Sequence, residues 1–389
     1  MVKTFRLDIC LVEEQFEMVQ YVEKGGKPRW RYFPKEGHPQ AVTRFDGTRI
    51  TPGFLQAIAY EVYVKNVIFG LLHQWLGDMG MTVSENTLRN WLKKGRKYLD
   101  RMVVELKRIA LEKDAVVNCD ETWCKVRKYD RYKKCYMWVL VNKAERVVIF
   151  FYEDGSRGRD VLTNFLGDVE LKALMSDGYN AYVFIGDGLK THRYKDTDHQ
   201  VCLAHVRAKF VKARMEGGDK RADVFLDNIN RLFRFEREYD REMITDGERT
   251  RRRQGLPTME AMINLRANLL QELKSEEEQK SCYMREALNY LHKFWNEAFT
   301  YIKDGRYPIS NNLAERAVRP FTTKRKNSLH FGSDEGAEIA AVYHSIISTV
   351  KLQGRSAWGY LGKFFTGIFN GCRDFLSLTP QNIDLAVCQ

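Results

Sequence analysis

The apolar pattern of the chain changes sharply near residue 114, and this change constrains the fold most strongly. The runs AVVNCDETWCKVRK, KCYMWVLVNK and RVVIFFYE are β-branched and aromatic, and short polar breaks separate them, which is typical of sequential strands. The pattern then indicates a helix at GRDVLTNFLG, a strand at LKALMSD, and a strand leading into a helix at VCLAHVRAKFVKA. Three sequential strands followed by alternating helix and strand predict an α/β fold, a mixed sheet with helices packed on it.

Helical patterns flank this sheet region on both sides. Before it, one helix is predicted from Pro52 towards Phe69, a second at LLHQWLGDM, and a third that follows the N-cap residue Ser84. After it, residues 211–300 are charged and helical, which indicates an insertion into the sheet domain, with the arginines of RTRRRQG as a basic hinge between helices. We predict six regions: a polar segment of open role at 1–50, a helical region at 51–112, the first part of the sheet domain at 113–215, the helical insertion at 216–304, the second part of the sheet domain at 305–355, and a helical tail at 356–389.

Charge and motif content narrow the classes of function. The 389 residues carry a net charge of +12, which favours polyanion partners, chiefly nucleic acid, over a merely basic soluble protein. The sequence has no GxxxxGK[ST] loop, so neither an ATP-driven motor nor a nucleotide cofactor is expected. The most apolar helical stretch carries Glu61 and Lys65, which argues against a membrane span. The start lacks a signal peptide and the eight cysteines form no CxxC pair, so we expect a cytoplasmic protein with free thiols.

Three acidic residues stand in unusual settings. Asp120 lies within or at the end of the first strand-like run, Asp177 closes LKALMS before Gly178, and Glu315 lies early in a helix. The C-terminal ends of sheet strands are common ligand positions. Each acid also has an ordinary explanation: a strand-end carboxylate satisfied by a lysine or an amide, an Asp in a turn, and a capping box with Asn312 as the N-cap.

Three carboxylates brought together by folding would suit two-metal phosphoryl transfer. Two divalent ions about 4 Å apart can activate the attacking oxygen and stabilise the leaving oxygen of a phosphodiester, and Mg²⁺ prefers carboxylate oxygens and water. In a strongly basic chain this combination indicates DNA chemistry. A carboxylate-pair hydrolase acting on sugars is a rival hypothesis, and the basic charge argues against it.

Basic and amide side chains surround two of these positions. Around Glu315 they are dense enough to suggest a track for phosphates, although Glu315 and Arg319 could instead form an ordinary i,i+4 salt bridge. In CLAHVRAKF, Cys202 and His205 lack two further ligands of zinc type, so His205 is predicted to contact phosphate or support the metal shell, with a satisfied core histidine as the alternative. The candidate phosphate contacts are His205, Arg207, Lys209, Asn311, Asn312, Arg316, Arg319, Lys324, Arg325, Lys326 and Asn327.

A second candidate DNA contact lies in the helical region 51–112. After Gly80, the segment VSENTLRNWLKKGRKYLDRMVVELKRIA places Leu88, Trp91 and Leu92 towards a core. Helix, short glycine turn and basic amphipathic helix resemble helix-turn-helix geometry, and a helical bundle with a solvated basic face is the alternative. The basic residues of this face are Arg89, Lys93, Arg96 and Lys97.

The order of four motifs carries a family resemblance. CDETWCKV, MSDGYNAY, CLAHVRAKF and ISNNLAERAVRPFTTKRKNSLHFGSDEGAEIAAVYHSIISTVKLQG closely resemble the bacterial insertion sequence sixty-six family of DDE transposases, from about Thr51 to the C-terminus. The resemblance implies a ribonuclease-H-like core, at 113–215 and 305–355, interrupted by the helical insertion. It implies Asp120, Asp177 and Glu315 as the catalytic, metal-binding triad, with two ions of Mg²⁺ or Mn²⁺.

The resemblance also implies binding partners, and the chain departs from the family's pattern in two respects. DNA would be bound as element ends and target by a homo-oligomer on paired ends, in the bacterial cytoplasm at the nucleoid. The family often carries a leading zinc module and coiled coil, whereas the first fifty residues here hold only Cys10, so we expect a shortened member. Ser310 stands where the family usually has Asp.

The sequence therefore predicts a transposase that cleaves DNA and transfers strands of an insertion sequence. Water would attack the phosphodiester at the element end, and the released 3′-hydroxyl would then attack target DNA. The alternative is a catalytically inactive DNA-binding relic or a domesticated transposase.

Overall fold

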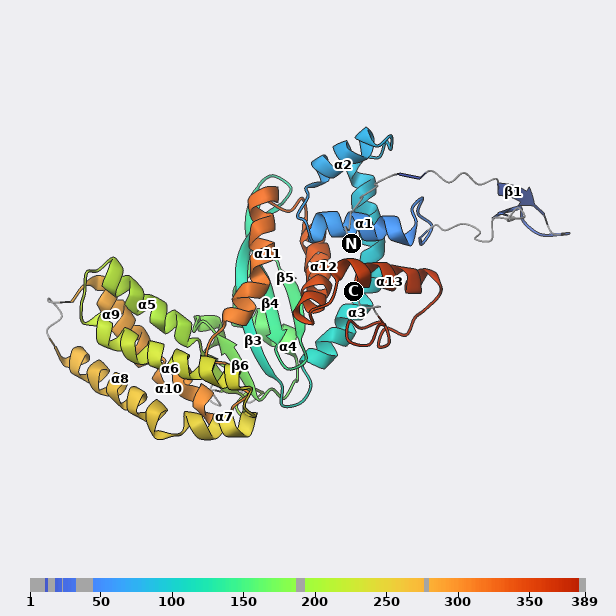
Figure 1. Cartoon of the computed structure of the whole chain (residues 1–389). Helices are drawn as coiled ribbons and strands as arrows, with labels where there is room; N and C mark the ends of the chain where they lie inside the picture. The colour runs from blue at the N-terminus through green and yellow to red at the C-terminus, as the bar shows by residue number, and fades with distance from the viewer. Residues whose placement is uncertain are drawn as a thin grey trace, which may run out of the picture. The chain divides into compact units, whose positions relative to one another are not determined.

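The computed structural model describes residues 11–12, 18–22, 24–32, 45–186, 193–275 and 280–384. Much of the predicted polar segment 1–50 lies outside these residues; within it, β1 (Met18–Tyr21) pairs antiparallel with β2 (Arg29–Tyr32). The chain forms two compact units (Figure 1). The first comprises Met1–Glu105, Thr323–Leu329 and Val342–Gln389, and the second comprises Leu106–Thr322 and His330–Ala341.

The second unit contains a five-stranded mixed sheet, as the sequence predicts. Its strands lie in the order β5-β4-β3-β6-β7. β3, β4 and β5 form an antiparallel meander, and β6 and β7 run parallel to β3. The strands are β3 (Val116–Arg127), β4 (Tyr132–Asn142), β5 (Val147–Glu153), β6 (Ala173–Ser176) and β7 (Asp198–Val201).

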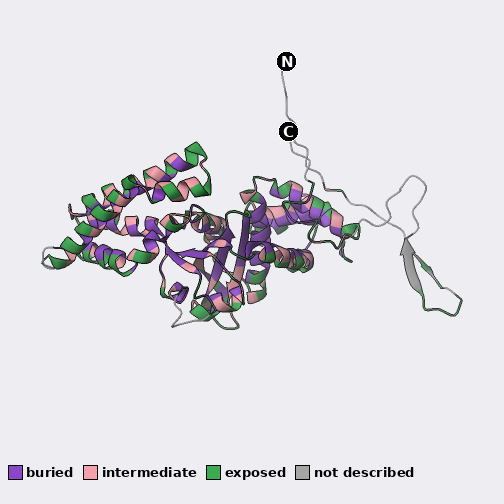
Figure 2. Cartoon of the chain, turned by 90° about the horizontal axis from the view of Figure 1, so that it is seen from below, coloured by how far each residue is buried: buried purple, intermediate pink, exposed green. Residues whose placement is uncertain are grey.

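β4, next to the central strand β3, is stabilised by apolar side chains on both of its faces. In β4 the run Met137–Val141 is wholly buried, and the strands are coloured as buried in Figure 2. Burial of each large apolar side chain stabilises the fold by roughly 1.5–3 kcal/mol. The connection between β5 and β6 is α4 (Arg159–Leu166), whose Phe165 ring stacks on Phe151 of β5 with 3.8 Å between centroids. The sheet is therefore a rigid platform for side chains at its edges and ends.

A helical segment separates β7 from the last helices of this unit. α5 (Leu203–Met215) packs with α6 and α9 around Phe210, Phe225 and Leu288, and Figure 1 shows these helices side by side. The remaining elements are α6 (Ala222–Glu242), α7 (Asp246–Arg253), α8 (Leu256–Lys274), α9 (Cys282–Lys293), α10 (Trp295–Phe299) and the short 3₁₀ helix η3 (Thr300–Lys303). This apolar core holds the segment together and also includes Ala173 of β6.

The arginine run predicted as a basic hinge is instead helical. Asp246–Arg253 forms α7, and its last residue is buried in the helical segment. The Arg253 guanidinium donates to both carboxylate oxygens of Glu236, at 2.8 and 2.7 Å, and to the carbonyl of Tyr301. The hinge prediction was wrong because Glu236, a buried acid on the preceding helix α6, pairs with the Arg253 guanidinium and holds it in the interior.

The two ends of the helical segment meet at one point. The Leu203 N–H donates to the carbonyl of Ile309 at 3.2 Å, and the Asn311 N–H donates to the Cys202 Sγ at 3.1 Å. These bonds join the start of α5 to the residues that lead into α11 (Asn312–Ser328). The segment therefore leaves and re-enters the sheet at the same place.

The first unit is helical. It contains α1 (Pro52–Tyr63), α2 (Phe69–Asp78), α13 (Ala357–Phe369), most of α3 (Glu85–Ala110) and part of α12 (Asp334–Leu352). The two helices predicted before Gly80 are α1 and α2, but the first ends at Tyr63, earlier than predicted. Asn66, between them, adopts a left-handed φ of 61°, a conformation that asparagine tolerates better than most residues. Ser84 caps α3 as predicted, since its Oγ accepts from the Thr87 N–H at 3.2 Å. Among the described helices, none is long and apolar enough to cross a membrane.

Candidate active site

Asp120 lies in the middle of β3, opposite Val139 of β4. Its Oδ1 accepts from the Glu121 N–H at 2.9 Å. Burial raises the pKa of the Asp120 carboxyl to about 8, and the neighbouring carboxylates of Glu121, Asp177 and Glu315 contribute to the same shift. A carboxyl in this setting lacks compensating positive charge, which is the condition that a bound cation would relieve.

Asp177 follows the last residue of β6, at the turn that the sequence predicts. Its Oδ1 accepts from the Tyr179 N–H at 2.9 Å, which closes the turn. Gly178 has a φ of +79°, and a Cβ there would lie 2.8 Å from the Tyr290 Oη. That hydroxyl, from α9 of the helical segment, donates to the Asp177 carbonyl. The Asp177 backbone is therefore held both by its own turn and by the helical segment.

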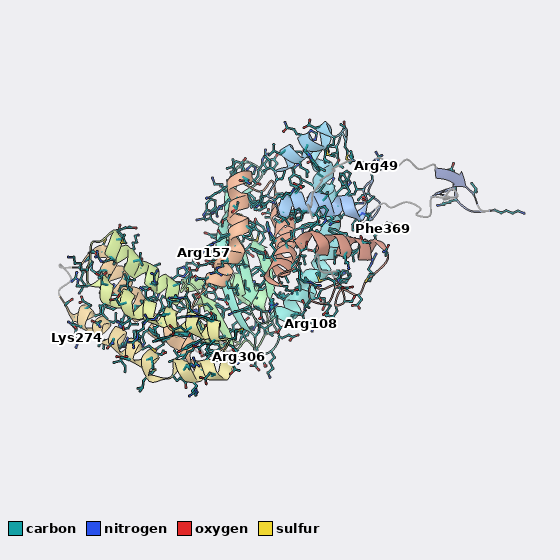
Figure 3. The ribbon with its side chains drawn as sticks, in the orientation of Figure 1. Arg49, Arg108, Arg157, Lys274, Arg306 and Phe369 are labelled. Atoms are coloured by element: carbon teal, nitrogen blue, oxygen red, sulfur yellow. The ribbon has the colours of Figure 1, made fainter. Side chains whose placement is uncertain are left out.

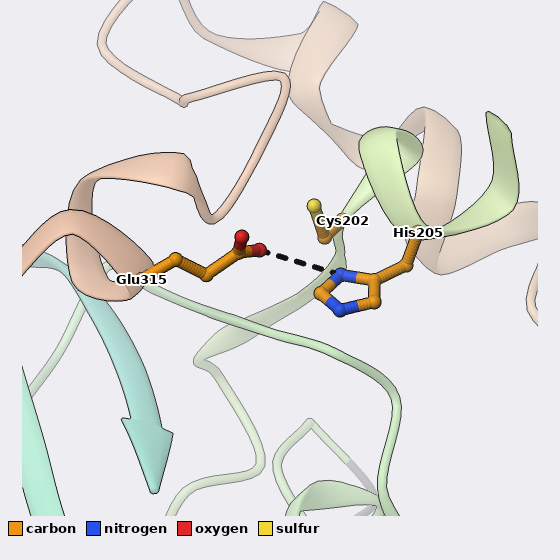
Figure 4. Close-up of side chains that lie close together, drawn as sticks. All are labelled: Cys202, His205 and Glu315. Atoms are coloured by element: carbon orange, nitrogen blue, oxygen red, sulfur yellow. Dashed lines mark ion pairs between the residues drawn. The ribbon is translucent and has the colours of Figure 1, made fainter. Parts of the chain in front are cut away.

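Glu315 lies in the first turn of α11. Its N–H donates to the carbonyl of Asn311 at 3.2 Å, which makes Asn311 the N-cap residue. The alternative that Asn312 caps the helix in a capping box is therefore contradicted. The Glu315 Oε1 lies 3.7 Å from the His205 Nδ1 of α5 (Figure 4).

The three predicted acids come from β3, from the turn after β6 and from α11. All lie in the second unit, and Asp120 interacts electrostatically with both of the others. Their donor atoms are carboxylate oxygens, which hard cations such as Mg²⁺ prefer. Among the described residues, however, the ligand atoms of these three acids do not form a group within 4.8 Å of one another, so the carboxylates influence one another without closing on a single point.

Glu121 is a fourth acid near this site, and the sequence analysis did not single it out. Its side chain is 1% exposed and forms an ion pair with Arg157. Arg157, labelled in Figure 3, belongs to the connection between the end of β5 and the start of α4. The Tyr182 Oη also donates to it. Burial raises the pKa of Glu121, while Tyr182 and Arg157 lower it. Because its charge has local partners, Glu121 differs from Asp120; the Asp-Glu doublet was the signal that could have drawn attention to it.

Asn311 ties the site elements together and is fully buried. Its Nδ2 donates to the Cys119 carbonyl, and its Oδ1 accepts from the Asn118 Nδ2, both at 2.9 Å. β3 is thereby fastened to the start of α11. The predicted phosphate contact by Asn311 therefore gives way to a positioning role, because phosphate has no access to a side chain enclosed in this way.

The side chains predicted on α5 are partly engaged with the helical segment. The Arg207 Nε donates to the Asn230 Oδ1 at 2.6 Å, and the Lys209 Nζ lies 2.5 Å from the Glu286 Oε1. Both basic residues are half-buried. These contacts orient the two cations next to His205.

The basic residues of α11 fall into different settings. In the second unit, Arg316 and Arg319 are exposed. In the first unit, Lys326 and Asn327 are exposed and Arg325 is half-buried.

Lys324 is buried, in contrast to the phosphate contact predicted for it. Its Nζ donates to the Val62 carbonyl at 3.2 Å and lies 4.0 Å from the centroid of the Tyr63 ring. Burial lowers the pKa of this lysine to about 7. The structure thus gives Lys324 a place in the core of the first unit, away from solvent.

The α3 residues predicted to face the core do so. Leu88, Trp91 and Leu92 are buried, and the basic residues of the other face are exposed or half-buried. Local acids pair with some of them: the Arg89 and Glu85 side chains approach to 2.6 Å, the Arg96 and Asp100 side chains to 3.3 Å, and the Lys97 and Asp46 side chains to 3.7 Å.

Comparison with known proteins identifies relatives. Residues 47–339 match the model of the family described as "Transposase IS66 family". The chain is 26% identical over 350 residues to the uncharacterized protein y4jD of Sinorhizobium fredii, covering 85% of this chain and 65% of that protein. It is 27% identical over 239 residues to the uncharacterized protein y4qI of the same organism, covering 61% of this chain and 43% of that protein. The chain thus spans less than two thirds of the length of these relatives.

Proposed function

Because the chain belongs to the IS66 family of transposases, we propose that it catalyses metal-dependent DNA cleavage and strand transfer of an insertion sequence. The observation that carries the proposal is that the elements bearing Asp120, Asp177 and Glu315 are joined to one another. β3 pairs with β6, and Asn311 fastens β3 to the start of α11. These residues are remote in sequence, and each lies on a different element. A carboxylate cluster of this kind, in a chain of net charge +12, suits a polyanionic substrate held near divalent cations.

In this proposal the sheet is a ribonuclease-H-like core. Its support is the strand order β5-β4-β3-β6-β7, with an antiparallel meander followed by two parallel strands. This order puts Asp120 on the central strand and Asp177 at the end of the adjacent parallel strand. α11 then brings Glu315 to them across the helical segment.

The cations would be held by Asp120, Asp177 and Glu315. The residues fit this role: the donors are hard oxygens, and the pKa of Asp120 is raised by burial and further by the neighbouring carboxylates, whose charge a cation would offset. Mg²⁺ or Mn²⁺ bound there would supply Lewis-acid activation of the attacking oxygen and stabilisation of the leaving oxygen.

The protein itself positions the ligand atoms. The Oδ1 atoms of Asp120 and Asp177 are each fixed by a backbone N–H at 2.9 Å, so each carboxylate has a set orientation. Asn311 fixes the distance between β3 and the start of α11 through its two amide bonds. Such orientation matters because small displacements of catalytic groups are costly in rate.

DNA binding is assigned to two basic surfaces, each within one unit. Arg316 and Arg319 follow Glu315 on exposed positions of α11, where they would contact the phosphates next to the scissile bond. The exposed face of α3 with Arg89 and Lys93 would bind DNA in the manner of a helix-turn-helix protein. We further propose that the active form is a homo-oligomer on paired element ends, with cleavage requiring both ends.

The test uses the purified chain and DNA carrying the ends of its own element. With Mg²⁺ or Mn²⁺, wild type is expected to cleave and join strands. Asp120→Asn, Asp177→Asn and Glu315→Gln are each expected to lose more than about 100-fold in rate, since the cations supply several kcal/mol to the transition state. The matched control is Asp168→Asn, because this side chain is 86% exposed and plays no part in the proposal.

Two results would count against catalysis. Cleavage that persists in all three acid variants would remove the triad assignment. Wild-type protein that binds the DNA in a salt-sensitive manner, but neither cleaves nor joins it with either metal, would instead identify a DNA-binding relic of the family.

A further inference from the structure

Cys202, His205 and Glu315 form a cluster of three different metal-ligand types. Cys202 precedes α5 as its N-cap residue, and His205 lies in the first turn of that helix. Glu315 approaches from α11, as Figure 4 shows. One ligand atom from each residue lies within 4.8 Å of the other two. We propose that this cluster is a binding site for a transition-metal ion of the Zn²⁺ type, beyond the oxygen-ligand site for Mg²⁺ or Mn²⁺.

An unsatisfied histidine nitrogen points to a ligand at this place. The Nδ1 of His205 is a buried atom that has no hydrogen-bond partner within the described part of the chain. The Glu315 Oε1, 3.7 Å away, is too distant for a hydrogen bond. A buried polar atom without a partner is costly, and an ion between His205 and Glu315 would satisfy both side chains at once.

The surroundings of the cysteine suit a metal-bound thiolate. The Cys202 Sγ accepts the Asn311 N–H at 3.1 Å, and Cys202 lies at the N-terminus of α5. Donors of this kind stabilise negative charge on sulfur at the start of a helix. These backbone groups would therefore help to stabilise the thiolate form of Cys202 that binds a metal ion.

The ligand types select the metal. Thiolate and imidazole favour Zn²⁺ and related ions over Mg²⁺, which keeps to oxygen ligands. Typical bond lengths are about 2.3 Å for Zn–S and about 2.0 Å for Zn–N. The distances between the three ligand atoms would therefore need to shorten by only about 1 Å for all three to bind one ion. Three protein ligands would leave a fourth position open, as in zinc sites that bind water or substrate.

A second cluster in the same unit provides a contrast. Cys135, Asp154 and Asp334 also bring ligand atoms within 4.8 Å of one another. There the Lys128 Nζ already lies 2.8 Å from Asp154 and 2.5 Å from Asp334. The Lys133 Nζ also lies 3.3 Å from Asp154, so two ammonium groups offset the two carboxylates. No metal is therefore proposed for this cluster, and Cys135 offers a matched control.

The inference rests on the proposed function only in sharing Glu315 with the catalytic triad. Metal binding is therefore tested directly on the full-length protein with Co²⁺, a spectroscopic substitute for Zn²⁺ that absorbs strongly when bound to thiolate. Wild type is expected to show a thiolate-to-Co²⁺ band that saturates at one ion per chain and that Zn²⁺ displaces. Cys202→Ser is expected to abolish the band, and His205→Ala to weaken Co²⁺ binding by more than about tenfold.

Two further variants separate this inference from the proposed catalysis. Cys135→Ser is expected to keep the band, and Asp120→Asn is expected to keep it while losing DNA cleavage. The inference is overturned if wild type shows no band, if Cys202→Ser leaves it unchanged, or if Cys135→Ser removes it. His205→Ala gives an independent result should Cys202→Ser fail to fold, because the His205 side chain is 39% exposed; unchanged Co²⁺ affinity in this variant would equally overturn the site.

Discussion

Asn311→Ala would remove the amide that fastens β3 to the start of α11. The wild-type side chain makes two hydrogen bonds of 2.9 Å, one to the Cys119 carbonyl and one from the Asn118 amide. Alanine leaves both partners buried. The Asn118 Nδ2 keeps only a longer contact with the Ser310 carbonyl, at 3.4 Å.

The expected loss of stability follows from these contacts. A buried polar group that loses its partner costs about 1–3 kcal/mol. Two such groups, one of them with a residual contact, give an expected decrease of about 2–4 kcal/mol in the free energy of unfolding. The measurement is urea unfolding of wild type and variant, followed by circular dichroism and compared at equal m-values.

The neighbouring asparagine supplies the control. Asn312 is exposed, so Asn312→Ala should change the free energy of unfolding by less than about 0.5 kcal/mol. If Asn311→Ala is as mild as Asn312→Ala, the idea that this amide holds the two elements together is refuted.

Two further predictions concern buried charges. Burial lowers the pKa of Lys324 to about 7 in the folded protein, below the pKa of the same lysine in the unfolded chain. The contribution of the neutral Lys324 side chain to stability is therefore fully present only above the unfolded pKa. It is lost as the pH falls towards 7. Relative to Lys324→Met, the free energy of unfolding of wild type should therefore rise from pH 7 to pH 9 by up to about 1.4 kcal/mol per pH unit; parallel urea titrations with no such difference would contradict the burial of the amine. Arg253→Met should lower the free energy of unfolding by about 1–3 kcal/mol, because Glu236 loses its two hydrogen bonds from Arg253 and keeps only Arg249, at 2.9 Å. Arg251→Met, at a side chain 77% exposed, should cost under about 0.5 kcal/mol in the same assay, and equal effects of the two substitutions would exclude a special role for the buried pair.

The strands and most helices could be predicted from local patterns, but α11 shows a limit. The density of its basic and amide residues predicts one continuous phosphate track. In the structure, Asn311, Ala314, Val318 and Phe321 form a buried stripe with spacings of three and four, and Lys324 continues it. That spacing is visible in the sequence and would have separated the buried from the exposed residues. Charge density alone does not make this distinction, and the phosphate contacts it predicts for Asn311 and Lys324 were therefore wrong.

Other features depend on contacts that no local pattern contains. The burial of Arg253 requires Glu236, which lies on another helix. The electrostatic coupling of Asp120 to Glu315 requires the fold to bring β3 and α11 together. The same applies to the cluster of Glu315 with Cys202 and His205, since only its Cys–His spacing is readable from the sequence.

The bonds from Leu203 to Ile309 and from Asn311 to Cys202 bear on how the chain folds. Because the helical segment begins and ends at one place, its length does not separate the two parts of the sheet domain once its own core has formed. The entropy of loop closure grows only as the logarithm of length, about 0.6 kcal/mol for each doubling. If the helical segment folds early, it would therefore hold its two ends together and bring α11 close to the sheet. By the same reasoning, natural or engineered changes in the length of this segment should be tolerated best at its far end, where they leave the junction intact.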